Sequence, residues 1–144
     1  MPNAQNGLKR KLDAQGRLSL PTSIMKRFPE DIKTFVVTVS PRENCLYIFE
    51  PEAFEDWLNS LFVADGGYCP TNLKHADLRS KMASRAVYTD RDNNDRIVIT
   101  AEQRKCAELD GEVTVFKNIN YIEVWSTKCW DEHNKLVDVM SLFS

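Results

Sequence analysis

A short motif occurs twice in this chain, and it constrains the possible folds more than any other feature of the sequence. Residues 13–20 read DAQGRLSL, and residues 92–99 read DNNDRIVI. Each copy has an aspartate, three residues typical of turns, an arginine and then alternating apolar positions. The alternation predicts a strand that begins at the arginine. The repeat predicts two related halves, each presenting one arginine from an equivalent position.

The repetition extends beyond the motif. The two motif arginines are 79 residues apart, whereas three downstream elements repeat at an offset of 76 residues. Three extra residues in the first half, near positions 29–31, account for the change of offset. The matching elements are 37–39 with 113–115, 46–49 with 122–125, and Phe54 with Trp130.

Each half therefore predicts the same order of elements: a strand, the turn, a second strand, a short helix, a hairpin and a longer helix. Thr22 can cap the first short helix, and Thr100 with Gln103 forms a capping box for the second. The predicted hairpins pair 35–39 with 45–49 and 113–116 with 121–125, with loops at 41–44 and 117–120.

The longer helices carry apolar stripes at helical spacing. In the first, Pro51 suits the first helical position, and the stripe predicts a buried or interface face. The second stripe is looser. The first stripe consists of Phe54, Trp57, Leu58, Leu61 and Phe62, and the second of Trp130, Val137, Met140 and Phe143.

These patterns divide the chain into four parts. Residues 7–63 form a first repeat, and residues 64–84 form a linker with a helix at 71–84. Residues 85–133 form a second repeat, and residues 134–144 form a helical extension.

Charge is unevenly distributed along the chain. Residues 1–28 contain six basic residues and one acid, a net charge of +5, so the remainder carries −7 to give the total of −2. A basic segment on an acidic body suits a surface that binds a polyanion. A solvated surface run explains the same pattern, and charge alone does not decide between the two.

Composition excludes several other classes of protein. No stretch approaches the ~20 apolar residues of a membrane span, and the N-terminus lacks the apolar run of a signal peptide, so we expect a cytoplasmic protein without a membrane partner. The four cysteines lack zinc-site spacing, which predicts free thiols and no metal or cofactor. They are Cys45, Cys69, Cys106 and Cys129.

Evidence for catalysis is weak. Cys129 and His133 are four residues apart on an expected helix and could pair as nucleophile and base, but nothing supplies an oxyanion hole or an orienting group. Packing on one helix face explains the spacing more simply. We therefore do not expect an enzyme.

The repeated turn itself allows two compatible interpretations. Structurally, Asp13 pairs with Arg17, or with the arginine of the other copy, and fastens the turn. Functionally, the planar five-donor fork of an arginine contacts phosphates or guanine edges. An aspartate can also hold an arginine in place for presentation.

Several segments resemble the MraZ family, bacterial transcription regulators built from two tandem SpoVT/AbrB-like repeats. The resemblance covers roughly residues 7–133. It lies in LDAQGRLSLP at 12–21, CLYIF at 45–49, EVTVF at 112–116 and IEVW at 122–125.

The resemblance implies an α+β, mainly β fold, in which two tandem AbrB-like swapped-hairpin repeats form one pseudo-dimeric β-barrel with flanking helices. It implies a ring-shaped homo-oligomer that binds double-stranded DNA at short direct repeats. These sites lie upstream of the division and cell-wall gene cluster, where the protein acts as a repressor associated with the nucleoid.

The family motif carries over to Asp13 and Arg17 in the first copy, with Gly16 in support, and to Asp92 and Arg96 in the second. Charge adds three further candidate DNA contacts on the strand before the first turn, Lys9, Arg10 and Lys11.

The second copy departs from the pattern. Asp95 replaces the glycine equivalent to Gly16, and Thr100 replaces the proline equivalent to Pro21. An acid beside Arg96 opposes phosphate binding. We therefore expect the first copy to contact DNA and the second mainly to complete the barrel.

An alternative from another class is a self-assembling AbrB-like protein-interaction module, similar to an antitoxin, with weak or no DNA binding. The acidic body and the aromatic closing helices permit it. Against it, only residues 134–144 follow the second repeat.

Overall fold

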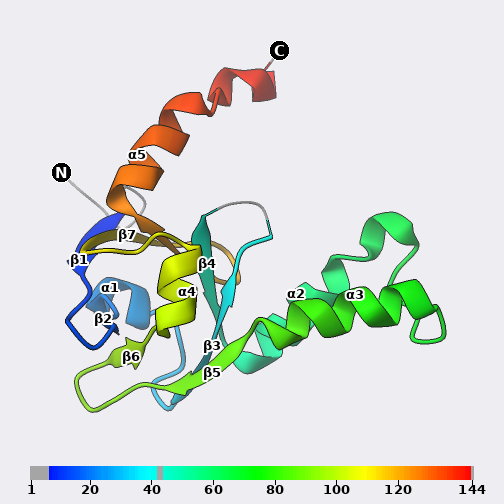
Figure 1. The fold of residues 1–144 in the computed structure, drawn as a ribbon, viewed down its shortest axis with the longest axis horizontal. Coiled ribbons are helices and arrows are strands. Elements are labelled where there is room, and N and C mark those ends of the chain that lie inside the picture. The colour runs from blue at the N-terminus through cyan, green and yellow to red at the C-terminus, as the bar shows by residue number, and fades with distance from the viewer. Residues whose placement is uncertain (1–6, 42–43, 144) are drawn as a thin grey trace.

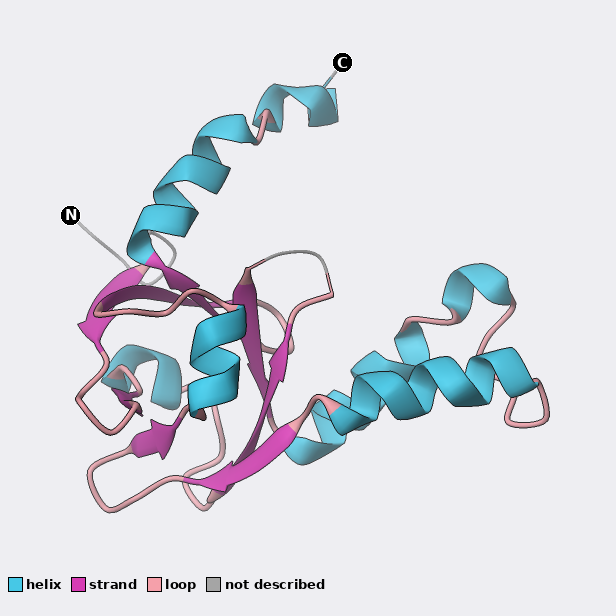
Figure 2. Cartoon of the chain, viewed as in Figure 1, coloured by secondary structure: helices cyan, strands magenta, loops and turns pink. Residues whose placement is uncertain are grey.

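The computed structural model describes residues 7–41 and 44–143, so Arg42 and Glu43 of the first predicted hairpin loop lie outside the described residues. It has a mixed α+β fold (Figures 1 and 2). The strands are β1 (Leu8–Lys11), β2 (Arg17–Ser19), β3 (Thr34–Val39), β4 (Cys45–Phe49), β5 (Val87–Asp90), β6 (Arg96–Val98), β7 (Glu112–Lys117) and β8 (Ile122–Ser126). The helices are α1 (Thr22–Met25), α2 (Pro51–Ser60), α3 (Leu73–Ser84), α4 (Ala101–Cys106) and α5 (Thr127–Leu136), with 3₁₀ turns η2 (Val63–Asp65) and η3 (Val139–Phe143).

The strands form an antiparallel six-stranded sheet in the order β1-β7-β8-β4-β3-β5 and a separate two-stranded ribbon, β2-β6. Both predicted hairpins, β3-β4 and β7-β8, are confirmed. The edge strands are exchanged between the halves: β1 pairs with β7, and β5 pairs with β3.

The expected closed barrel is not present in the described residues, because the six-stranded sheet is open and β1 and β5 are its two edges. Each edge strand has only four residues and ends at a motif turn. The chain then continues into the β2-β6 ribbon instead of extending the edge strand far enough to close the sheet (Figure 1).

Two strand pairs reveal a quasi-two-fold relation between the halves. In β4-β8, Tyr47 lies opposite Glu123, its equivalent at an offset of 76 residues. In β2-β6, Leu18 lies opposite Ile97, its equivalent at an offset of 79. Antiparallel strands place a residue opposite its own equivalent only where a two-fold axis passes between them. The repeat alignment, with its change of offset, thus agrees with the strand register.

The main core lies between the sheet and the ribbon. Leu18 and Ile97 are both 0% exposed, and they pack with apolar side chains from both halves. Burying apolar side chains is the main favourable contribution to folding. The ribbon therefore depends on both halves for its stability.

The short helices begin close to the predicted positions, but two details of their capping predictions are wrong. Thr22 is the first helical residue of α1, and Pro21 stands at the N-cap without a side-chain cap bond. Thr100 caps α4 as predicted, accepting from the Gln103 amide at 3.1 Å. The Gln103 side chain does not hydrogen-bond the Thr100 amide. Helix α4 packs on β3, and Gln103 Nε2 instead donates to the Val37 carbonyl at 2.9 Å.

Two helical segments extend from the sheet (Figure 1). Helix α2 begins at Pro51 as predicted and buries Phe54 and Leu58, while Leu61 is 41% exposed just past its end. Helix α3 packs along α2.

The second predicted apolar stripe, which runs along α5 and η3, packs against the sheet only at its first residue, Trp130. Trp130 contacts Trp125 at 5.3 Å between ring centroids, whereas Val137, Met140 and Phe143 are more than half exposed. The apolar end of α5 and η3 lies beyond the edge of the sheet and packs against none of it (Figure 2).

Candidate nucleic-acid interface

The Asp13 carboxylate organises the first turn. Its Oδ1 accepts from the Arg17 amide at 2.8 Å and from the Gln15 amide at 2.9 Å. Its Oδ2 accepts from Arg17 Nε at 2.6 Å. One carboxylate thereby fixes both the turn and the arginine side chain at the start of β2.

The second turn repeats these bonds at equivalent positions. Asp92 Oδ1 accepts from the Arg96 amide at 3.0 Å and from the Asn94 amide at 2.8 Å. Its Oδ2 accepts from Arg96 Nε at 2.8 Å. Each aspartate pairs with the arginine of its own copy, so the structural interpretation of the motif is confirmed.

Hydrogen bonding lowers the pKa of both motif carboxylates, Asp13 and Asp92. The Arg17 backbone amide is the main cause that lowers the pKa of Asp13 below its usual value, and the Arg17 side chain adds to the effect. The Arg96 backbone amide likewise lowers the pKa of Asp92. Both carboxylates are therefore ionised when they hold the turns.

Each turn is also bound to the other half. The Ile99 amide donates to the Gly16 carbonyl at 2.8 Å, and the Leu20 amide donates to the Asp95 carbonyl at 2.9 Å. These two bonds are equivalent under the quasi-two-fold relation. The position of either arginine therefore depends on the strand of the opposite half.

The ribbon presents both motif arginines on one outer face. Arg17 lies opposite Val98, and Arg96 lies opposite Ser19, so the arginines are diagonal neighbours on the face away from Leu18 and Ile97. Their side chains are 34% and 28% exposed. Within residues 7–41 and 44–143, no acceptor bonds their Nη nitrogens, which leaves these donors for an anion.

Gly16 makes room for an arginine that the sequence did not reveal. It is buried with φ of +80°, and a Cβ there would lie 2.7 Å from the Ile99 carbonyl oxygen and 2.9 Å from Arg104 Cζ. Arg104 comes from α4 of the second half, so it reaches the first turn across the quasi-two-fold axis. Only the exchanged strand pairing could have predicted this neighbour.

The strand before the first turn separates its three basic residues. Lys9 and Lys11 are exposed, whereas Arg10 is partly buried on the other face, and its Nη1 donates to the Lys9 carbonyl. In the second half, Tyr88 and Asp90 stand at the positions of Lys9 and Lys11. The basic strand is therefore a property of the first half alone.

Known proteins named MraZ are similar to this chain over most of its length. A family model described as "MraZ protein, putative antitoxin-like" matches residues 7–64. The transcriptional regulator MraZ of Saccharopolyspora erythraea is 30% identical over 129 residues, covering 87% of this chain and 85% of that protein. The chain belongs to the MraZ family.

Other MraZ proteins match to a similar extent. Transcriptional regulator MraZ of Corynebacterium urealyticum is 27% identical over 124 residues, covering 86% of this chain and 81% of that protein. The protein of the same name from Thermoanaerobacter sp. is 27% identical over 129 residues, covering 89% and 84%. MraZ is a family of regulators and not a known family of enzymes.

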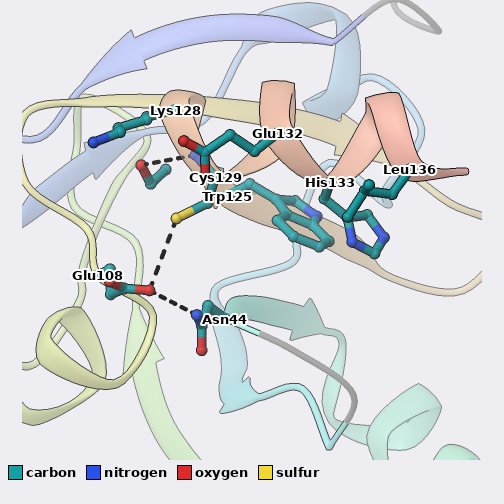
Figure 3. A pocket seen from close by; sticks show the side chains of 9 residues that line it. Asn44, Glu108, Trp125, Lys128, Cys129, Glu132, His133 and Leu136 are labelled. Atoms are coloured by element: carbon teal, nitrogen blue, oxygen red, sulfur yellow. Dashed lines mark hydrogen bonds between the residues drawn. The ribbon is translucent and has the colours of Figure 1, made fainter.

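Cys129 and His133, considered above as a possible nucleophile and base, contact different neighbours in this MraZ-family structure. In the pocket shown in Figure 3, Cys129 Sγ lies 3.9 Å from Glu108 Oε2, which also accepts from Asn44. The His133 ring instead stacks on Trp125 at 4.8 Å. No hydrogen bond joins Cys129 to His133 in the part of the chain described, and each packs against other side chains.

The described ranges contain neither a metal-binding cluster nor a membrane-spanning helix. No group of three or more His, Cys, Asp or Glu residues there could hold a metal ion. None of the helices among those residues is long and apolar enough to cross a membrane.

Substituting Gly16 tests the packing of the first turn. We expect Gly16→Ala to lower the free energy of unfolding by about 1–3 kcal/mol more than Gly111→Ala, because only the former adds a backbone clash. Gly111 is the matched control: its φ is +88°, and a Cβ there meets nothing within 4 Å. Urea denaturation measures both, and equal losses would contradict the described contact.

Acid pH tests the two motif carboxylates. Because folding lowers the pKa of Asp13 and Asp92, their stabilisation is present above the unfolded carboxylate pKa of about 3.9 and is lost as pH falls through the folded values. We expect stability to fall less between pH ~5 and ~3 in D13N/D92N than in the unmodified chain. Urea denaturation at both pH values measures this, with D56N/D131N as a control that removes two exposed carboxylates, on α2 and α5.

Proposed function

We propose that this chain is a sequence-specific, double-stranded DNA-binding transcription regulator whose first turn makes the main DNA contact. The observation that carries the proposal is the geometry of Arg17. Asp13 fixes its Nε at 2.6 Å, while its Nη nitrogens have no acceptor among the described residues and lie on the outer face of the ribbon. A preorganised arginine whose two Nη nitrogens have no acceptor among the described residues suits a phosphate or a guanine edge.

The surroundings of the first turn support the same conclusion. Residues 8–20 contain four basic residues and one acid, a net charge of +3, whereas the equivalent residues 87–99 contain two basic residues and three acids, a net charge of −1. Exposed Lys9 and Lys11 precede Arg17 on the same half. We therefore assign DNA contact to Arg17, Lys9 and Lys11, and a supporting role to Asp13, Gly16 and Arg104.

The remaining motif residues have different roles in this proposal. Arg10 is partly buried, so it contributes charge more than direct contact. Arg96 and Asp92 mainly maintain the second half of the ribbon. The exchange of β1 and β5 between the halves supports the swapped-hairpin, pseudo-dimeric arrangement.

Relatives named transcriptional regulator MraZ support a regulatory role. By family resemblance, we further propose that the chain assembles into a ring-shaped homo-oligomer at the nucleoid. There it binds short direct repeats upstream of the division and cell-wall genes and represses them. Assembly would multiply one basic patch per subunit by avidity.

A second candidate function is protein interaction of the antitoxin type. One observation favours it: Leu136, Val139, Met140, Leu142 and Phe143 are all more than 60% exposed. Apolar surface of this extent commonly marks an interaction site. A gel-shift experiment with direct-repeat DNA distinguishes the candidates, because the interaction module would leave the DNA unshifted.

Arg17→Ala tests the proposed function. We expect it to weaken binding to the duplex that the unmodified protein enriches from genomic DNA by about 1–3 kcal/mol and to reduce its salt dependence. The fold should persist, because the bond from the Arg17 backbone amide to Asp13 remains. Fluorescence anisotropy at several salt concentrations measures both quantities.

Lys81→Ala is the control, since Lys81 is an exposed basic residue on α3, away from the ribbon. It should leave the affinity unchanged. An unchanged affinity in a correctly folded and assembled R17A protein would rule out the role given to Arg17.

A further inference from the structure

The side chain of Asp95 distinguishes the second turn from the first, and we propose that it restricts DNA contact to one turn per subunit. In this proposal, which rests on the proposed function, the Asp95 carboxylate is an internal anion that occupies Arg91 and repels phosphates from Arg96. Asp95 thus determines which of the two turns binds DNA, although it contacts no DNA itself.

Backbone geometry does not explain a difference between the turns. The Asp92 turn makes the same three bonds to its aspartate as the Asp13 turn. Asp95 has φ of +56° and Gly16 has φ of +80°, so both are left-handed. Arg96 is therefore held as Arg17 is, and the two turns differ in their charged surroundings.

Both Nη nitrogens of Arg91 are hydrogen-bonded beside the second turn. Its Nη1 donates to Asp95 Oδ1 at 2.9 Å, and its Nη2 donates to the Glu30 carbonyl at 2.9 Å. Its backbone amide donates to the Lys33 carbonyl at 2.8 Å. Glu30 belongs to the three extra residues of the first half, so this insertion helps to hold Arg91 away from an outside anion.

The second turn carries partly exposed carboxylates at two positions where the first turn has none. The Asp95 side chain is 50% exposed, and that of Asp90, which lies 3.8 Å from Lys33 Nζ, is 55% exposed. At the first turn, the corresponding positions are Gly16 and Lys11. Because Asp95 directly precedes Arg96 in the chain, a phosphate approaching Arg96 would meet the Asp95 carboxylate within the Debye length of about 8–10 Å.

Asp95→Asn removes the charge with little change of shape. Asparagine tolerates the left-handed backbone, and its Oδ1 can still accept from Arg91. We expect D95N to bind a labelled random-sequence duplex more tightly than the unmodified chain. The slope of log K against log salt should become steeper by about 0.9 for each additional phosphate that the protein neutralises.

Asp56→Asn is the matched control, because Asp56 is an exposed residue on α2 and the change removes the same charge away from the ribbon. It should leave the slope unchanged. Adding Arg96→Ala to D95N should abolish the increase in affinity, since Arg96 makes the new contact.

The outcomes separate the two proposals. If the unmodified chain binds the duplex but D95N and D56N have the same affinity and slope, the role of Asp95 is wrong and the proposed function stands. An increase in affinity in D95N that survives Arg96→Ala also overturns the inference. If the unmodified chain binds no duplex even at low salt, the proposed function fails, and this inference fails with it.

Discussion

The exchange of strands between the two halves is the constraint on which the rest of the structure depends. Strand β1 completes the sheet beside β7, and β5 completes it beside β3. The reciprocal bonds from Ile99 to Gly16 and from Leu20 to Asp95 join the turns to the opposite strands. Because each arginine is positioned by a turn fixed in this way, presentation of the ribbon face is a property of the paired halves and of neither half alone.

Much of the fold could be predicted from the sequence, because the signals for it are local. Alternating apolar residues and turn residues identified the strands and hairpins, and Thr100 identified the start of α4. Pairing partners are not encoded locally, which is why the open sheet, the acceptor of Gln103 and the neighbour of Gly16 were missed. Helical periodicity likewise identified the stripe ending at Phe143, but periodicity does not distinguish a buried face from one that α5 and η3 leave exposed.

The candidate site shows the same division between local and distant signals. Pairing of Asp13 with Arg17 follows from their spacing and turn chemistry, and the structure has this pair. The basic residues of β1 were identified by charge, but only the structure shows that Lys9 and Lys11 lie on the exposed face and Arg10 on the partly buried one. Asp95 was recognised as an acid near Arg96, yet its actual partner is Arg91, which is held in turn by an insertion about sixty residues earlier in the chain.

The unequal charge of the two halves has a consequence for the symmetry of any DNA site. A unit with two equivalent contacting turns would have a molecular two-fold axis and would suit a palindrome. Here the backbone keeps that axis through Leu18 and Ile97, while the side chains around the turns break it. On the proposed function, one subunit therefore has a polarity along the duplex. An array of such subunits facing the same way would require DNA sites arranged as direct repeats. An inverted site would place the acidic half of the subunit against the phosphates.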